Sequence, residues 1–418
     1  MSCLGEHRSM TRTRALAACI ATLVASAIVV VAAPTANAVV MEPPRPAFYE
    51  SPATLPAANG TVIRTEPMTF LLDPLNATSL VTNAKRVLYK STNRAGRAIA
   101  VSGVVLVPKT SWIGLGSRPV IGFAAGTQGM GDRCAPSRQY SEGLEYEGIA
   151  IQGLLNRGYA VAVTDYEGLG TAGVHTYMDR VSQGRAVLDV IRAAQRIPGT
   201  GLSATSPVGV QGYSQGGGAA ASAAELAATY APELRIKGVA VGAVPADLAK
   251  VATNLDGSLY SAFAFFALRG ISASYGVDLT PYLNATGVET MTTVEQDCVF
   301  DLFGHAFVKS STLSYNSKPM SDLIALPQFS AMIADQRIGN IRPAMPVFVG
   351  HSTFDDVIPY AAGRAMAKSW CSKGANVRFS PTLIPTHVGG YVPFGVEAAL
   401  FFEGRFAGIP QWSNCWVI

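Results

Sequence analysis

Residues 207–225 restrict the fold more than any other stretch of this chain. They read PVGVQGYSQGGGAAASAAE: a short strand-like run, a serine between glycines, and a series of small residues that suits a helix. This order predicts a strand, a sharp turn and a helix, with Ser214 at the apex of the turn. Gly212 and Gly216 lack the Cβ atoms that would clash in so tight a turn. A serine held in this way projects its hydroxyl out of the sheet.

Strands and helices alternate along most of the chain. The predicted strands are continuous apolar runs, which is typical of strands buried on both faces. They are residues 98–107, 119–124, 159–164, 208–210, 236–244, 344–349 and 377–384. Helices are predicted after Ser214 and over residues 146–155, 178–197, 360–373 and 392–402. The alternation predicts the α/β class, with a mostly parallel, doubly wound sheet covered by helices on both faces.

Two regions depart from this alternation. Residues 39–79 are rich in proline and poor in periodicity, which predicts an extended amino-terminal arm over the core. Residues 247–337 contain helix-like patches and no convincing buried strand, so we expect a helical cap or lid inserted between two core segments, 39–246 and 338–418. Inside this insertion, residues 260–268 (YSAFAFFAL) are either packed core or the wall of a lid over an apolar substrate.

The amino terminus has the form of a secretory signal. Basic residues up to Arg14 precede an uncharged apolar run, and Ala36-Asn37-Ala38 provides an A-x-A cleavage site. We therefore expect residues 1–38 to be removed and the mature protein to be secreted, either to the medium or to the cell envelope. The alternative is an uncleaved membrane anchor, because the apolar run is nearly long enough to span a bilayer.

Charge and cysteine content narrow the possible partners. Residues 1–38 hold three of the 32 basic and one of the 28 acidic residues, so the mature chain is close to neutral. Nucleic-acid binding requires a basic surface, and we expect no such partner. The cysteines that remain are Cys134, Cys298, Cys371 and Cys415. An even number in an exported chain predicts two disulfide bonds, with three connectivities open. Since no Cys-x-x-Cys occurs among them, we expect no metal site.

A reactive serine needs a base within hydrogen-bond reach and a carboxylate that orients the base. For a serine at a strand-to-helix turn, the usual order along the chain is serine, acid, histidine. His387, in the turn PTHVGG after a predicted strand, is the only histidine preceded by both the serine turn and a strand-end acid. Asp355, in HSTFDDVIP, has the usual spacing to Ile-Pro, whereas Asp356 lies one residue out of register. We predict Ser214, Asp355 and His387 as nucleophile, acid and base.

The same residues have ordinary structural explanations. Asp355 could cap the helix that follows it, and His387 could be a plain turn residue. His351 is expected to support the turn that carries the acid. His305 lies in the insertion, where a packing or surface role is expected.

Hydrolysis at a serine also requires two backbone N–H groups that bind the oxyanion of the tetrahedral intermediate. One is expected from Gln215, the residue after the serine. The other is expected from the glycine-rich loop AGTQGMG after residues 119–124, with Gln128 as first choice and Thr127 as second. The alternative for this loop is a plain turn.

Taken together, these motifs resemble the secreted lipase family of α/β-hydrolases that includes the fungal lipase A type. The matches occur in order over most of the mature chain: AGTQGMGDRCAPS at 125–137, DYEGLG at 165–170, GYSQGG at 212–217, FDDVIPY at 354–360 and THVGG at 386–390.

The resemblance implies an α/β-hydrolase fold in which a helical cap covers an acyl tunnel. It implies the roles already named for the serine, acid and base, and an oxyanion hole formed by Gln128 and Gln215. It also implies which cysteines pair, namely Cys134 with Cys298 and Cys371 with Cys415.

We therefore expect a secreted serine ester hydrolase that acts through an acyl-enzyme and needs no metal or organic cofactor. Acylglycerols and other lipid esters are the favoured substrates, because the aromatic insertion and the apolar content of 49% suit a long acyl chain. A transient contact with a lipid interface would accompany this activity. The alternatives are a short-chain or polyester-type esterase, an acyltransferase with the same triad, and, from another class, a non-catalytic binding protein of the cell envelope.

Overall fold

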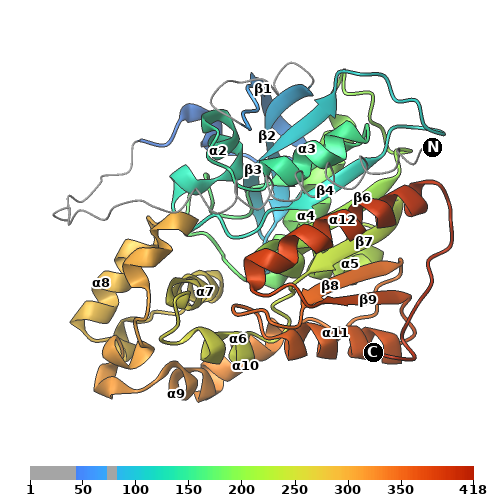
Figure 1. The fold of residues 1–418 in the computed structure, drawn as a ribbon. Helices are drawn as coiled ribbons and strands as arrows, with labels where there is room; N and C mark the ends of the chain where they lie inside the picture. The colour runs from blue at the N-terminus through green and yellow to red at the C-terminus, as the bar shows by residue number, and fades with distance from the viewer. Residues whose placement is uncertain (1–43, 73–81) are drawn as a thin grey trace, which may run out of the picture. The chain divides into compact units, whose positions relative to one another are not determined.

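The computed structural model of the protein describes residues 44–72 and 82–418 (Figure 1). The signal segment expected at residues 1–38 and part of the expected amino-terminal arm lie outside these ranges. Nine strands of the described chain form a single sheet, and helices lie on both of its faces. This arrangement confirms the predicted α/β class.

The strand order in the sheet is β1-β2-β3-β5-β4-β6-β7-β8-β9. β1, β2, β3 and β5 pair antiparallel, whereas β5, β4, β6, β7, β8 and β9 pair in parallel. The strands are β1 (Val62–Met68), β2 (Thr82–Thr92), β3 (Ala98–Pro108), β4 (Val120–Ala124), β5 (Ala160–Thr164), β6 (Val208–Tyr213), β7 (Ile236–Gly242), β8 (Val347–Ser352) and β9 (Val377–Thr382). Because parallel strands place their carboxyl ends at one edge of a sheet, residues that follow β4, β6, β8 and β9 gather at that edge.

The helices are α2 (Pro136–Glu142), α3 (Gly148–Asn156), α4 (Arg180–Arg196), α5 (Gln215–Tyr230), α6 (Leu248–Leu255), α7 (Ser261–Tyr275), α8 (Ala285–Val294), α9 (Met320–Ala325), α10 (Pro327–Asp335), α11 (Tyr360–Ser372) and α12 (His387–Phe406). Short 3₁₀ helices are η1 (Ala47–Tyr49), η3 (Asp132–Cys134), η4 (Thr280–Tyr282), η5 (Val299–His305), η6 (Ser310–Thr312) and η7 (Tyr315–Ser317). None of the helices in the described ranges combines the length and the apolar character that crossing a bilayer requires.

Helices cover both faces of the parallel part of the sheet. α4 and α5 pack against each other on one face, and α3 and α12 pack against each other on the opposite face (Figure 1). Every residue of β4, β5 and β6 is buried between these layers. Burial on both faces explains why these strands are continuous apolar runs in the sequence.

The chain between β7 and β8 is helical. Residues 243–346 contain α6 to α10 and no strand, with one isolated bridge between Leu283 and Ser314 and another between Cys298 and Gly129. Their apolar side chains form a second hydrophobic cluster, separate from the cluster around the sheet, with Phe265, Phe266 and Phe329 among its buried members. In Figure 1 these helices lie together at the lower left.

Two strands are absent from the sequence prediction. β1 lies within the stretch predicted as a non-periodic arm, and that prediction is wrong over residues 62–68, which pair with β2. Both strands mix apolar and charged residues, as VIRTEPM and TNAKRVLYKST, so neither shows the apolar run that marks the other strands. β1 is at the edge of the sheet, where polar side chains reach solvent and Pro67 is tolerated.

Candidate active site

Ser214 occupies a strained turn between β6 and α5. Its backbone angles, φ 58° and ψ −122°, are costly for a residue with a Cβ atom. The turn is held by a hydrogen bond of 3.0 Å from the Ser214 N–H to the carbonyl of Gly242 on β7. A Cβ atom on Gly212 would lie 2.1 Å from the Gly216 carbonyl oxygen, and one on Gly216 would lie 2.0 Å from that of Ala124. The two glycines therefore permit the turn and its close approach to β4.

Asp355 and His387 are joined by a hydrogen bond. Asp355 follows β8, and His387 follows β9, the neighbouring strand. Nδ1 of His387 lies 2.8 Å from Oδ2 and 3.0 Å from Oδ1 of Asp355. This contact places the ring proton on Nδ1 and leaves Nε2 free to act as a base. The structure thus brings the predicted acid and the predicted base together.

The turn after β8 keeps Asp355 ionised. Its Oδ1 accepts hydrogen bonds from the N–H groups of Val357 (2.9 Å) and Ile358 (2.8 Å). Burial acts to raise the pKa of Asp355, but hydrogen bonds from His351 and His387, with the charge that these rings can carry, outweigh it. The pKa consequently lies below its usual value, and the group is a carboxylate throughout the neutral range.

Two neighbours support this pair. Nε2 of His351 donates to the carbonyl of Ile358 (3.1 Å) and lies 3.4 Å from Oδ2 of Asp355. Asp356, the alternative acid, accepts a hydrogen bond of 2.8 Å from the backbone N–H of His387. Because Asp356 contacts the backbone of His387 and Asp355 contacts its ring, the geometry favours Asp355 as the acid.

His387 is the first residue of α12, and the prediction that it lies in a turn is wrong. Thr386, with φ 69°, precedes the helix, and its side chain accepts a hydrogen bond from the N–H of Gly389. Gly389, Gly390 and Pro393 are poor helix formers, which explains why the sequence predicted a helix only from residue 392. The base is therefore held at a helix amino terminus.

Tyr213 connects the serine turn to this helix. Its hydroxyl donates to the carbonyl of His387 (2.7 Å), and the two rings are 5.1 Å apart. No hydrogen bond joins Oγ of Ser214 to the His387 ring, although both residues belong to the described chain. Catalytic hydrogen bonds of this kind often tighten only in the substrate complex. The contact between nucleophile and base stays a prediction.

The two predicted oxyanion donors, Gln215 and Gln128, follow the neighbouring strands β6 and β4. Gln215 is the first residue of α5, so its N–H has no acceptor within the helix. Gln128 follows β4, which neighbours β6 in the sheet. Both side chains are buried and hydrogen-bonded. The side-chain amide of Gln215 bonds to Nε2 of His175 (3.1 Å), and that of Gln128 donates to Oε1 of Glu145 (2.9 Å). Thr127, the second choice, bonds through its hydroxyl to Tyr177 (2.6 Å).

No role was predicted for His175, and the structure gives it one. Its Nδ1 donates to the carbonyl of Glu167 (2.9 Å), so its Nε2 must accept the hydrogen bond from Gln215. Burial lowers the pKa of His175 to about 4, and the ring is therefore neutral at physiological pH. No sequence motif marks this contact, because it depends on the packing of two separate segments.

The loop that carries Gln128 is tied to the helical region between β7 and β8. The four cysteines form two disulfide bonds, Cys134–Cys298 and Cys371–Cys415, which are the pairs that the family resemblance implies. Beside the first bond, the N–H of Val299 donates to the carbonyl of Gln128 (2.7 Å), and the N–H of Met130 donates to the carbonyl of Asp297 (2.8 Å). The position of the Gln128 peptide therefore depends on residues 297–299.

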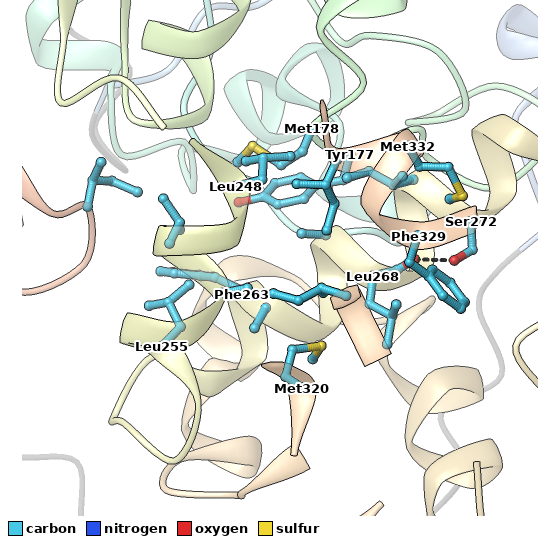
Figure 2. A pocket seen from close by; sticks show the side chains of 18 of the residues that line it. Tyr177, Met178, Leu248, Leu255, Phe263, Leu268, Ser272, Met320, Phe329 and Met332 are labelled. Carbon is cyan, nitrogen blue, oxygen red and sulfur yellow. Dashed lines mark hydrogen bonds between the residues drawn. The ribbon is translucent and has the colours of Figure 1, made fainter. Parts of the chain in front are cut away.

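Ser214 lines an apolar pocket built largely by the same helical region. The pocket contains about 730 Å³ of space that atoms do not fill, part of it open to solvent. Figure 2 shows side chains from α6, α7, α9 and α10 around it, including Leu248, Leu255, Phe263, Leu268, Met320, Phe329 and Met332. Ser272 is one of its few polar residues, and its hydroxyl is satisfied by the carbonyl of Leu268 (2.6 Å). Within residues 44–72 and 82–418, no cluster of His, Cys, Asp and Glu could hold a metal ion.

Comparison with known proteins relates most of this chain to one group. A family model described as Secretory lipase matches residues 136–414. A probable inactive lipase of Mycobacterium tuberculosis is 30% identical over 385 residues, which cover 87% of this chain and 82% of that protein. Lipase A of Moesziomyces aphidis is 29% identical over 379 residues, covering 85% and 78%. The crystal structure of Candida antarctica lipase A in its closed state superimposes with a TM-score of 0.77 at 25% identity, over 88% of each chain. The predicted α/β-hydrolase fold is thereby confirmed.

Proposed function

This chain belongs to the secretory lipase family, and from that membership we propose that it is an exported serine hydrolase that cleaves lipid esters through an acyl-enzyme. The observation that carries the proposal is the position of Ser214. It stands in a strained turn, it lines an apolar pocket, and the hydrogen-bonded pair Asp355–His387 lies at the same edge of the sheet. A hydroxyl in this position can meet both an acyl chain and a base.

In the proposed reaction, Nε2 of His387 removes the proton of the Ser214 hydroxyl as Oγ attacks the ester carbonyl. Asp355 holds the opposite ring nitrogen and stabilises the imidazolium that forms. The protonated ring then gives its proton to the leaving alcohol, and Ser214 is left acylated. Water attacks this acyl-enzyme with His387 again as base, which releases the acid and restores the serine.

We assign the oxyanion hole to the backbone N–H groups of Gln128 and Gln215. Donors that are fixed before the reaction stabilise the negative charge that develops on the carbonyl oxygen, and loss of one costs about 10²- to 10³-fold in rate. Support comes from the hydrogen bonds that hold both side chains away from the pocket and from the contact of Val299 with the Gln128 carbonyl.

The apolar pocket supports a lipid acyl chain as the group transferred to Ser214. Each methylene moved from water into such a site contributes about 0.8 kcal/mol, or about fourfold in binding. We propose residues 247–337 as the cap that supplies these walls, because α6, α7, α9 and α10 contribute most of the lining. Acylglycerols are the proposed substrates.

A non-catalytic role is the alternative from a different class. It is favoured by one observation, that a relative at 30% identity is named a probable inactive lipase. In this chain all three proposed catalytic positions carry usable side chains, and the acid and base are in contact. A short-chain or polyester-type esterase, or an acyltransferase, would use the same triad and would differ in the acyl and acceptor groups.

Labelling with a fluorophosphonate probe tests the nucleophile. We expect the wild type to be labelled and Ser214→Ala to be unlabelled, with Ser222→Ala, a buried serine on the same helix, as the matched control. Equal labelling of the wild type and Ser214→Ala would refute the assignment, and an unlabelled wild type would favour the non-catalytic alternative.

Chain-length profiling with p-nitrophenyl esters, from acetate to palmitate, separates the lipase from its enzymatic alternatives. Activity that peaks at medium or long chains supports the lipase, whereas activity confined to acetate and butyrate would remove that designation. For export, we expect mass spectrometry of the secreted protein to find Val39 as its first residue. An intact residue 1–38 segment on the mature protein would contradict cleavage.

A further inference from the structure

Two buried glutamates, Glu145 and Glu147, contact the loop that carries Gln128. Glu145 is 7% exposed and Glu147 is 1% exposed. Within the described residues, neither carboxyl group forms an ion pair with a lysine, arginine or histidine. Buried carboxyl groups without a cation are costly, so their contacts require an explanation.

Both carboxyl groups form hydrogen bonds with the loop of residues 125–131, which carries Gln128 and is called the oxyanion loop below. Oε2 of Glu147 accepts a hydrogen bond from the backbone N–H of Gly126 (2.7 Å), and Oε1 of Glu145 accepts one from the side chain of Gln128 (2.9 Å). The N–H of Glu147 donates to Oε2 of Glu145 (2.8 Å), which fixes the two glutamates to each other. The loop is thus held at two positions, one on each side of Thr127.

Glu147 also contacts the helix that begins with the base. The hydroxyl of Tyr391 on α12 donates to Oε1 of Glu147 (3.4 Å). The ring of Tyr391 packs edge-on against Tyr213 at 5.1 Å, and the hydroxyl of Tyr213 bonds to the carbonyl of His387. One carboxyl group therefore lies between the oxyanion loop and α12.

The packing around Gly126 leaves the loop little freedom. A Cβ atom at Gly126 would lie 2.5 Å from the hydroxyl of Tyr146 and 3.3 Å from Oε1 of Glu147. The hydroxyl of Tyr146 donates to the carbonyl of Thr127 (3.1 Å). Displacement of the Glu147 carboxyl group would therefore be transmitted to the loop.

The surroundings of the pair keep it protonated near neutral pH. Burial raises the pKa of Glu147 to about 8, and burial together with repulsion from Glu147 raises the pKa of Glu145. The titratable groups that face the pair from the packed elements are the phenols of Tyr140, Tyr146, Tyr166 and Tyr391. Burial raises the pKa of each of these phenols, so all four are neutral.

We propose that Glu147, together with Glu145, is a positioning residue for ester hydrolysis: it holds the oxyanion loop through Gly126 and α12 through Tyr391. This inference rests on the proposed hydrolase function. Ionisation of the pair places additional negative charge behind Gln128. Such charge opposes the oxyanion that forms in the transition state.

The test is the pH dependence of kcat and KM on p-nitrophenyl butyrate between about pH 6 and about pH 10. In the wild type we expect kcat to fall at alkaline pH with a midpoint near 8, as Glu147 ionises. Glu147→Gln keeps an oxygen that accepts from the Gly126 N–H, and its amide group can donate to the phenol oxygen of Tyr391 in place of the bond that Tyr391 donates to Glu147, but it does not ionise. Whatever its kcat at neutral pH, its alkaline midpoint should rise by at least about one pH unit.

Two further variants separate positioning from general stability. Glu147→Ala removes the acceptor of the Gly126 N–H, and we expect kcat to fall about 10- to 100-fold with KM changed less than about threefold, because only the transition state uses the oxyanion hole. Glu225→Gln is the matched control. Glu225 is also a buried carboxyl group with a raised pKa, yet it binds Trp370 and Gly339 far along α5. Its alkaline midpoint should equal that of the wild type.

Thermal unfolding provides a readout that does not require catalysis. A carboxyl group whose pKa is higher in the folded than in the unfolded state makes the folded protein less stable as the pH rises from the unfolded-state pKa to the folded-state pKa. The reason is that the unfolded chain releases this proton at a lower pH than the folded chain does. The Tm of the wild type should therefore fall between about pH 4.5 and pH 8, and Glu147→Gln should lack part of that fall. If Glu147→Gln does not fold, Tyr391→Phe replaces it and should raise the alkaline midpoint of kcat, because the hydrogen bond from Tyr391 lowers the pKa of Glu147.

The outcomes are distinct. An alkaline midpoint in Glu147→Gln equal to that of the wild type, or an equal shift in Glu225→Gln, would overturn the inference while leaving the hydrolase function intact. A wild type without any esterase activity would refute the proposed function, and the inference with it, even where the Tm profiles showed that Glu147 holds the proton.

Discussion

Removal of the disulfide bond between Cys134 and Cys298 tests the link between the oxyanion loop and the helical region. The double variant Cys134→Ala/Cys298→Ala deletes the bond without leaving a free thiol from the pair. Around the bond, residues 297–299 contact the loop through the hydrogen bonds of Val299 to Gln128 and of Met130 to Asp297. These contacts would remain possible but would no longer be held by a covalent bond.

The loss of stability follows from the length of chain that each bond closes. The cysteines of this pair are separated by 164 residues, and those of the pair Cys371–Cys415 by 44. In the chain-entropy model, bonds that close loops of these lengths stabilise the folded state by about 5 and about 4 kcal/mol, respectively. The two loops do not overlap, so the two losses should add.

The two disulfide bonds should differ much more in their effect on kcat than in their effect on stability. Cys134 is in the segment that follows Gln128, whereas Cys415 and its neighbour Asn414 lie beside Val377 at the start of β9. The start of a parallel strand is at the sheet edge opposite to the candidate active site. We expect Cys134→Ala/Cys298→Ala to lower kcat by at least about tenfold through misplacement of the Gln128 N–H, and Cys371→Ala/Cys415→Ala to keep kcat within about twofold.

The assay combines urea unfolding followed by circular dichroism with kcat measured at a temperature at which every variant is fully folded. A Cys134→Ala/Cys298→Ala variant with wild-type kcat would refute the coupling between this bond and the oxyanion loop. An equal loss of kcat in Cys371→Ala/Cys415→Ala would show that the effect is a general consequence of lower stability.

Three further predictions concern the acid, the serine turn and the pocket. Asp355→Asn should lower kcat for ester hydrolysis about 10³- to 10⁴-fold, whereas Asp356→Asn should lower it less than about tenfold, because the Asp356 carboxyl group bonds to the backbone N–H of His387 and to the Tyr260 hydroxyl but not to the His387 ring; equal losses would contradict the assignment. Gly216→Ala should lower the free energy of unfolding in urea by at least about 2 kcal/mol, because its Cβ would lie 2.0 Å from the Ala124 carbonyl oxygen; an unchanged value would contradict the tight turn. Ala267→Phe should remove room for about two methylenes in the pocket, and kcat/KM for laurate relative to butyrate should fall about 15-fold; an unchanged ratio would show that the acyl chain lies elsewhere.

Strands buried on both faces were predictable because burial forces an apolar composition that is visible in the sequence. β3 to β8 all fall within the predicted runs or overlap them, and so does β9, although it is an edge strand and only partly buried. β1 and β2 were not found, because strands at and near the edge of a sheet carry charged residues that resemble those of loops. The start of α12 was missed for a related reason: glycines and a proline in its first turns oppose a helix locally, and tertiary contacts such as the Asp356 bond to His387 outweigh them.

The candidate triad was predictable because its members stand in short motifs, each at the end of a predicted strand. In the sequence, Asp355 was preferred to Asp356 because of its spacing to Ile-Pro. In the structure, Asp355 bonds to the ring of His387, whereas Asp356 bonds to its backbone N–H. The supporting residues were not predictable. Glu147 and His175 contact the site across segments that are distant in sequence, and neither stands in a motif that signals such a role.

The sequence by itself determined the α/β alternation, the serine turn and the order of the candidate catalytic residues, because each follows from local patterns of apolar residues, glycines and motif spacing. Only the tertiary structure decided that Asp355 bonds to the ring of His387, that His387 begins a helix, and that Glu147 lies between the oxyanion loop and α12. These contacts join residues separated by 21 to 244 positions, and a distance of a few ångströms between such residues depends on how the whole sheet and its helices pack.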